Sequence, residues 1–253
     1  MAKTGPGGAD LAGLPRPQYP SRYKSTSSRP EHKSRGAARR ALNAPPRTPD
    51  RNHPTDAERT DMTTPNQAAL DFLLSRRSRP IQTLAAPAPD REALAPILTA
   101  ALRSPDHGKI EPWRLMVLQD GALTRLSKLA ETRGKALGLE PEKTAKGVDM
   151  FAQTPLCVAV IASPEPSDKV PEIEQILSAG AVCTALLNAA LAAGWGAHWL
   201  TRWVSHDRTF VEEGLGLAPH EFVAGLIHIG TETAPPPERP RPDPARKVAW
   251  VGE

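Results

Sequence analysis

The sequence is poor in cysteine, which limits both its compartment and the way its fold is stabilised. Among 253 residues only Cys157 and Cys183 are cysteines, and each lies in an apolar stretch. Two cysteines cannot build a disulfide framework, and a small buried thiol is the ordinary state of such a residue. The N-terminus also lacks the apolar run of a secretory signal. These absences favour a reducing, cytoplasmic setting.

Long runs of large apolar side chains are lacking as well. The most apolar window, 176–193, is mostly alanine and contains Ser178, Thr184 and Asn188. Small side chains contribute little transfer free energy to a bilayer. The window therefore predicts a helix that is packed on every side within a globular domain, and no membrane partner.

Several common catalytic motifs are absent. The sequence has no phosphate-binding loop, no Gly-x-Ser-x-Gly elbow, no His-Glu-x-x-His and no Cys-x-x-Cys. Gly194 and Gly196 begin like a dinucleotide fingerprint, but Trp199 stands at the third glycine position and the segment leads from helix to strand. The five histidines after residue 61 show no metal-ligand spacing, and no tyrosine follows residue 61. We therefore expect no metal site and no phenolic acid catalyst.

The positive charge is concentrated in the first 61 residues. This segment holds 12 Lys and Arg against 6 Asp and Glu, whereas 62–253 holds 20 against 22. It also holds nine prolines and almost no core-forming residues, so it cannot offset its ordering entropy. We expect a disordered basic extension over 1–61, absent from the native protein if Met62 is the biological start. A folded domain over 62–253 would follow, and binding of nucleic acid is not expected of it.

The pattern after Pro65 alternates helices and strands, which predicts a sheet covered by helices. Helices are expected from Asn66 to about Arg76, from Asp90 to Ser104 with a late start or a kink at Pro96, and over 123–137, 141–150, 171–193 and 206–214. Strands are expected over 114–119, 155–162, 197–201 and 222–230. The proline-rich stretch 234–244 must be extended, within an arm that leaves the domain over 231–253.

Three groups of arginines stand at the ends of predicted elements. They are Arg76 to Arg79 after the first helix, Arg103 to His107 after the second, and Trp199 to Arg202 after a short strand. An arginine at a helix C-terminus often only complements the helix dipole and is otherwise solvated. Alternatively, the three groups converge on one anionic ligand and bind it through guanidinium forks.

Five motifs in order resemble the nitroreductase family, and most closely its minimal, YdjA-like branch. The motifs begin at Arg76, Arg103, Ser178, Gly194 and Ile229, and the resemblance runs from about Asn66 to Gly230. The resemblance implies an α+β fold with a central mixed or antiparallel sheet flanked by helices. It also implies an intertwined homodimer that binds FMN at each end of its interface. The small residues of 176–193 would let this helix pack closely against the partner subunit.

The resemblance further assigns the site residues. FMN would be bound by three groups of residues: Arg76 with Arg77 and Ser78, Arg103 with His107, and Trp199 with Leu200 and Thr201. In addition, Arg239 or Arg241 of the C-terminal arm would reach the FMN phosphate. The nicotinamide nucleotide would lie along Ala189, Ala190, Leu191, Ala192, Ala193 and Gly194. Larger relatives often have a lysine near flavin N1 and O2 at the position where this sequence has Pro80. Either Arg77 or Arg79 supplies that charge here, or the reduction potential of the flavin differs from that of the larger relatives.

These features predict an FMN-dependent NAD(P)H oxidoreductase with a ping-pong mechanism. NADH or NADPH would give a hydride to the flavin and leave, and a small electron-poor acceptor, such as a nitroaromatic or a quinone, would take the same site. No side chain is expected to act as acid or base, because the flavin carries the chemistry. Two alternatives remain: a flavoprotein of this fold that catalyses dehalogenation or a specialised dehydrogenation, and an adaptor tethered to nucleic acid by its basic tail.

Overall fold

The computed structural model describes residues 64–252 of the chain. The predicted disordered extension over 1–61, and the proposed start of the protein at Met62, lie outside these residues. The described residues comprise the predicted folded domain from residue 64 onward and its C-terminal arm.

Helices and strands occur in the predicted order, with ends that mostly agree to within two residues. The helices are α2 (Gln67–Ser75), α3 (Arg91–Ala101), α4 (Gly121–Ala136), α5 (Pro141–Ala152), α6 (Glu172–Ala192) and α7 (Arg208–Leu215). The strands are β1 (Leu84–Ala85), β2 (Trp113–Leu118), β3 (Leu156–Ala162), β4 (Gly196–Leu200) and β5 (Phe222–Glu232). Strand β1 was not predicted.

The strands form one antiparallel sheet around β5. Its order is β1-β5-β3-β2, and β4 also pairs with β5. All seven residues of β3 are buried, as expected for a continuous apolar strand with both faces covered. The α+β prediction is therefore confirmed, with an antiparallel sheet.

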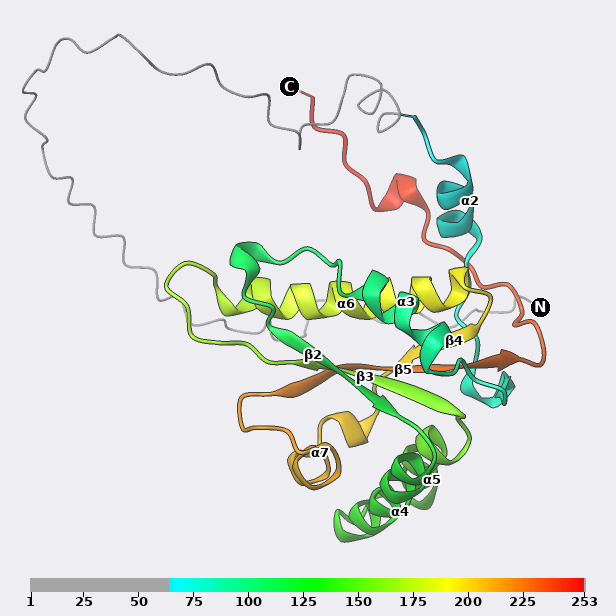
Figure 1. Cartoon of the computed structure of the whole chain (residues 1–253), viewed down its shortest axis with the longest axis vertical. Coiled ribbons are helices and arrows are strands. Elements are labelled where there is room, and N and C mark those ends of the chain that lie inside the picture. The colour runs from blue at the N-terminus through cyan, green and yellow to red at the C-terminus, as the bar shows by residue number, and fades with distance from the viewer. Residues whose placement is uncertain (1–63, 253) are drawn as a thin grey trace, which may run out of the picture. The chain divides into compact units, whose positions relative to one another are not determined.

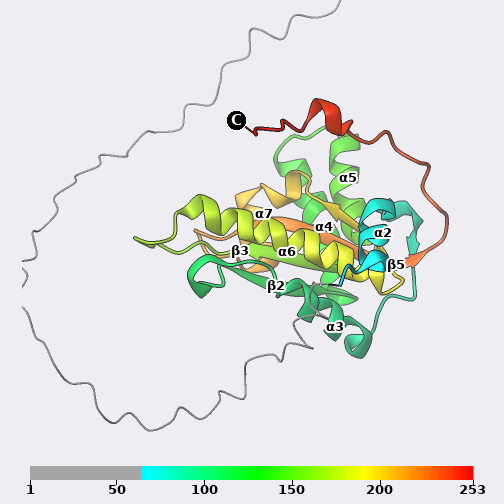
Figure 2. The ribbon, with the colours of Figure 1, turned by 90° about the horizontal axis from the view of Figure 1, so that it is seen from above.

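Each face of the sheet carries its own helices and its own hydrophobic core (Figure 1). Helices α4, α5 and α7 cover one face, where Phe151 and Phe210 stack with ring centroids 5.7 Å apart. Helices α3 and α6 cover the other face, where Val158 and Ile227 of the sheet meet Leu186 of α6. Figure 2 shows α6 running along the sheet.

Local sequence signals explain where several helices begin. The side chains of Asn66, Asp90 and Asp207 accept hydrogen bonds from backbone N–H groups of α2, α3 and α7, so each residue is an N-cap. The late start expected at Pro96 is wrong, because α3 already begins at Arg91 and continues through the proline. The cap at Asp90 fixes this start.

Within one chain helix α6 is not buried on all sides, so the packing on every side predicted for 176–193 requires the expected partner subunit. Its inner face packs against β3, β4, β5 and α3, but Leu177 is 66% exposed and Ile173 is 57% exposed. Gly180 lies open as well, since a Cβ added there would meet no atom within 4 Å. Among the described residues α6 is the one helix long and apolar enough to cross a membrane, yet it is the central helix of this domain. An apolar face of α6 thus remains uncovered within one chain.

The C-terminal arm leaves β5 and runs past the end of α2 (Figure 1). Residues 235–243 contain neither helix nor strand, as the prolines led us to expect, whereas Pro244 begins a short 3₁₀ helix, Pro244–Arg246. The arm carries exposed apolar side chains, of which Trp250 is 94% exposed.

Candidate functional site

The segment after α2 is fixed to the edge of β4 by two reciprocal hydrogen bonds. The backbone N–H of Arg79 donates to the carbonyl of Ala197 at 2.8 Å. In return, Nδ1 of His198 donates to the carbonyl of Arg79 at 2.9 Å. Within the segment, Nη2 of Arg76 donates to Oγ of Ser78 at 3.2 Å. Two of the predicted groups, 76–78 and 199–201, are therefore brought to one edge of the sheet.

The C-terminal arm joins the same place. Nη2 of Arg77 donates to the carbonyl of Pro237 at 2.5 Å, and Nη2 of Arg241 lies 3.4 Å from the carbonyl of Arg76. Of the two candidate arginines of the arm, Arg241 is the one whose side chain contacts this segment. The side chain of Arg239 has no hydrogen bond or ion pair among those found in the described part of the chain.

Positive charge exceeds negative charge in this cluster. Arg79 forms an ion pair with Glu232 at 2.7 Å, and Arg241 forms one with Glu238 at 3.2 Å. Arg76 and Arg77 have no carboxylate partner within 4 Å among the described residues. Four guanidinium groups thus face two carboxylates, and two positive charges remain without a counter-charge.

The electrostatic consequence is visible at Arg76. Its pKa lies below the usual value, first because the guanidinium is partly buried and then because Arg241, Arg77 and Arg79 repel its charge. Repulsion among four cations costs free energy that an anion at their centre would recover. The cluster is therefore suited to bind an anion.

Buried donors point to the same conclusion. The Nε atoms of Arg76, Arg77 and Arg202 are buried and have no hydrogen-bond partner in the described part of the chain. Leaving a buried charged donor without a partner is costly, so such groups are expected to bind an acceptor in the functional state. Planar guanidinium forks match the oxygens of a phosphate.

A cleft of about 720 Å³ adjoins β4 and is lined by Trp199 of that strand, by Thr201 just after it, and by Leu177 and Gly180 of α6, among others. Trp199 packs over Gly225, where a Cβ would collide with its ring. Clefts of this size accommodate cofactors. The side chain of the predicted residue Leu200 packs on the opposite face, against the core of α4 and α7. Only its backbone is available at the cleft.

Arg103 and His107 do not join the cluster within one chain. Arg103 lines a separate cleft with Ala181 and Thr184 of α6, two residues that also line the cleft of Trp199. Nδ1 of His107 lies 2.6 Å from Oε2 of Glu174 in the first turn of α6. Arg103 and His107 therefore lie across the exposed face of α6, here called its ridge, from the cleft of Trp199.

The predicted nucleotide segment 189–194 ends α6. Ala190 is fully buried, whereas Ala192, Ala193 and Gly194 are exposed. The backbone N–H groups of Ala193 and Gly194 donate to carbonyls of the last helical turn. Only these exposed residues of the segment are available to a nucleotide.

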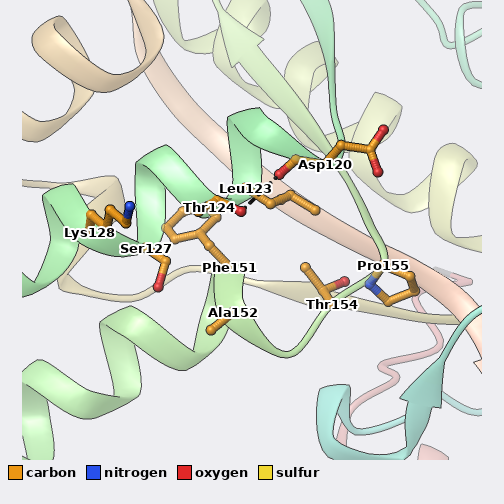
Figure 3. Close-up of a pocket in the computed structure, with 9 residues that line it drawn as sticks. All are labelled: Asp120, Leu123, Thr124, Ser127, Lys128, Phe151, Ala152, Thr154 and Pro155. Carbon is orange, nitrogen blue, oxygen red and sulfur yellow. Dashed lines mark hydrogen bonds between the residues drawn. The ribbon is translucent and has the colours of Figure 1, made fainter.

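Another cavity lies on the opposite side of the sheet, between α4 and the end of α5 (Figure 3). Its volume is about 380 Å³, and Thr124, Ser127 and Lys128 line it from α4. It contains none of the predicted residues and a single cation, Lys128. No group of three or more metal-ligating side chains occurs within the described range 64–252. We therefore place the candidate site at the arginine cluster.

Sequence reasoning placed Arg202 in the group Trp199 to Arg202 that could bind an anion, but the family resemblance assigned only Trp199, Leu200 and Thr201 to the FMN site. The ion pair of Arg79 was not foreseen. Glu232, which engages Arg79, carries no local signal, because the two residues are 153 positions apart and meet only in the folded domain.

The sequence matches a known protein family and proteins that carry related names. A model of the nitroreductase family matches residues 73–231. A relative from Haemophilus influenzae named "Putative NAD(P)H nitroreductase" is 36% identical over 165 residues, covering 64% of this chain and 88% of that protein. The Escherichia coli protein named "Putative NAD(P)H nitroreductase YdjA" is 34% identical over 163 residues, covering 64% and 87%.

A solved structure shares the fold. It is that of "a putative nitroreductase in complex with FMN" from Desulfovibrio desulfuricans, with a TM-score of 0.57 and 21% sequence identity. The match covers 75% of this chain and 99% of that chain.

Proposed function

The chain belongs to the nitroreductase family and is an FMN-dependent oxidoreductase, and we propose that it transfers hydride from NADH or NADPH to small electron-poor acceptors. Nitroaromatics and quinones are the proposed acceptor class. The observation that carries the proposal is the cluster of Arg76, Arg77, Arg79 and Arg241, in which two positive charges lack a counter-charge.

The residues of the cluster fit the phosphate of FMN. A phosphate monoester carries about 1.5 to 2 negative charges near neutral pH. This charge roughly balances the two positive charges that lack a counter-charge in the cluster. The unpartnered Nε atoms of Arg76 and Arg77 supply donors for its oxygens. We assign the phosphate to Arg76, Arg77, Ser78 and Arg241, and the ring system to the cleft of Trp199 and Thr201.

When bound, FMN supplies the capacity to accept a hydride at N5 and to pass it on. The protein contributes position and electrostatics. Trp199 and the backbone of Leu200 and Thr201 would form one wall for the ring, and the arginine cluster would bind the phosphate at the other end of the cofactor. Donor and acceptor would occupy the same cleft in turn, and the exposed residues Ala192, Ala193 and Gly194 at the end of α6 remain the proposed contacts of the nicotinamide nucleotide. Within this cleft we assign no side chain the role of acid or base.

We assign the remaining residues, Arg103 and His107, to the site of a partner subunit in a homodimer. They stand across the ridge of α6 from Trp199, so a second chain seated on α6 would add them to the cleft of its partner. Leu74 of α2 is 72% exposed and Leu177 of α6 is 66% exposed, as expected of surfaces covered by another subunit. The small residue Gly180 would allow close approach there. We further propose that the dimer is cytoplasmic.

Spectroscopy of the purified protein tests the proposal. Oxidised-flavin absorption bands, followed by bleaching with NADH or NADPH and recovery with a nitroaromatic or a quinone, are the expected result. The variant R77Q should lose most bound FMN, whereas R125Q, which changes an exposed arginine of α4 without a described partner, should retain it. A colourless protein that FMN cannot reconstitute would contradict the proposal.

The alternative within this fold is a different flavin reaction, such as a dehalogenation or a specialised dehydrogenation. It is distinguished by a flavin that is bound and reduced but not reoxidised by either acceptor class. The adaptor alternative depends on residues 1–61, outside the described range, and predicts DNA binding that weakens with salt and disappears when these residues are deleted.

A further inference from the structure

The loop between α3 and β2 has an unusual backbone. Gly108, Lys109 and Glu111 have positive φ angles of 75°, 56° and 53°. This left-handed region is unfavourable for a lysine or a glutamate, so such a backbone persists only where its surroundings fix it, and it is often found at functional sites. The loop carries Arg103 and His107, the two residues assigned above to the site of a partner subunit.

Ser178 of α6 fixes both ends of this loop. Its hydroxyl donates to the carbonyl of Pro105 at 2.7 Å and accepts from Nε1 of Trp113 at 3.0 Å. Ser178 is buried, so loss of these two hydrogen bonds would leave polar groups without water as a substitute. Pro105 lies near the start of the loop and Trp113 begins β2, so the base of the loop is attached to α6 independently of its tip.

Glu174, one helical turn before Ser178, holds the tip of the loop. Its Oε2 lies 2.6 Å from Nδ1 of His107. Residues four apart share one face of a helix, so Glu174 and Ser178 contact the same loop. A carboxylate has no proton to donate, so Nδ1 of His107 must carry the proton of this hydrogen bond. Nε2 is then the ring nitrogen available to a ligand.

The pair of His107 and Glu174 is not explained by the stability of one chain. Both side chains are exposed, and exposed ion pairs contribute little to the free energy of unfolding. The contact does restrict the imidazole, which otherwise rotates about two side-chain torsions. A ring that is held before a ligand binds loses less rotamer entropy when the ligand arrives.

We propose that Glu174 is a positioning residue that holds His107 in the orientation in which its Nε2 contacts the FMN of a partner subunit. This inference rests on the proposed function, which assigns His107 to that site. Glu174 itself touches no cofactor and acts only through the imidazole. Because Ser178 anchors the base of the loop, removal of the Glu174 carboxylate should release the ring without unfolding the loop.

A double-mutant cycle on the FMN affinity of the full-length protein tests this role. E174A should weaken FMN binding about fivefold in the wild-type background and leave it unchanged in the H107A background, because the two residues act as one unit. E174Q should recover most of the affinity, since its amide oxygen still accepts from Nδ1. E172A removes another carboxylate of the same helical turn, one without a described partner, and should match wild type.

Nitrogen-15 NMR of the histidine ring gives a second readout that does not depend on flavin affinity. The His107 signals, identified by their loss in H107A, should show a proton on Nδ1 in wild type and a shift toward the Nε2–H tautomer in E174A. Circular dichroism and sedimentation velocity should show the same fold and association state for E174A and wild type. If E174A does not fold, the tautomer of His107 in wild type and the affinity of E174Q still decide.

The inference is overturned if E174A weakens FMN binding equally in both backgrounds, because Glu174 would then act through the helix and not through His107. It is also overturned by E174A or H107A variants that bind FMN like wild type, or by a wild-type His107 protonated on Nε2 alone. In each of these cases wild type still binds FMN, so the proposed function stands. A wild-type protein that binds no flavin would contradict both.

Discussion

The arginines on the two sides of the sheet have opposite fates. On the side of α4 and α7, Arg114 and Arg133 make bidentate pairs with Glu221 and Asp207 at 2.7 to 3.1 Å. At the opposite edge, beyond the end of α2, Arg76 and Arg77 have buried Nε atoms with no hydrogen-bond partner among the described residues. The same residue type therefore stabilises the fold where the protein supplies its carboxylate partner, and it forms the proposed phosphate site where the protein supplies none.

The glycines of the two sides differ in the same way. A Cβ at Gly214 of α7 would meet Leu126 at 2.8 Å, whereas a Cβ at Gly180 of α6 would meet nothing within 4 Å. The first glycine is required by the packing of its own chain. Packing within one chain does not require a glycine at Gly180. A second subunit packed on α6 would explain why this residue is small.

The largest expected effect comes from filling the open side. G180L should leave the circular dichroism spectrum unchanged but weaken the proposed dimer at least about a hundredfold, since a large side chain would separate the two subunits. Sedimentation velocity over a range of concentrations measures this. G214A is the matched change on the closed side, and it should lower stability without changing the association state. A G180L protein that dimerises like wild type would disprove the proposed interface.

The second prediction removes donors from the open cluster. The double variant R77Q/R241Q should bind FMN about a hundredfold more weakly, because two charge-assisted hydrogen bonds to the phosphate contribute roughly 3 kcal/mol together. Riboflavin, which lacks the phosphate, should bind to the variant and to wild type with similar affinity. Fluorescence titration measures both ligands. An equal loss for riboflavin would show that the cluster does not bind the phosphate.

The third prediction breaks a pair on the closed side. Glu221 is buried, and its pKa is lowered to about 2, chiefly by its hydrogen bonds with Arg114, although burial opposes the shift. E221A should lower the free energy of unfolding by about 2 kcal/mol, less than for a fully buried pair because Arg114 is partly exposed. Urea denaturation measures it. FMN affinity of the folded variant should not change, and a large change would mean that the two sides are coupled.

The smallest effect concerns acid stability. The pKa of His228 is about 3 in the folded protein, mainly because of burial, and about 6.5 in an unfolded chain. The unfolded state therefore binds more protons between these values, so stability falls as the pH drops below 6.5. This group should cost about 1 kcal/mol between pH 7 and pH 5.5. H228L should remove that part of the slope in urea unfolding measured at several pH values, and H206L, which changes an exposed histidine, should retain it.

The sequence predicted the order of the elements because apolar periodicity and caps are local. The Asn66 and Asp90 caps and the continuous apolar run of β3 lie within their own segments. The site was predicted as groups of residues but not as an arrangement. Contacts between distant segments determine which arginine of the arm meets Arg76. They also determine that Glu232 pairs with Arg79. That His198 and His228 are opposite each other depends on the register of β4 and β5, which no local pattern specifies.

The contact between the C-terminal arm and the segment after α2 has a consequence for the order of folding. Arg77 and Pro237 are 160 residues apart, and Arg76 and Arg241 are 165 apart. Contacts of such long range close large loops, and the loop entropy is recovered only after the intervening sheet and helices have formed. The proposed phosphate site should therefore be among the last parts of the molecule to form. Cofactor uptake would then report completed folding, and apoprotein in which this arm has not docked would be unable to retain FMN.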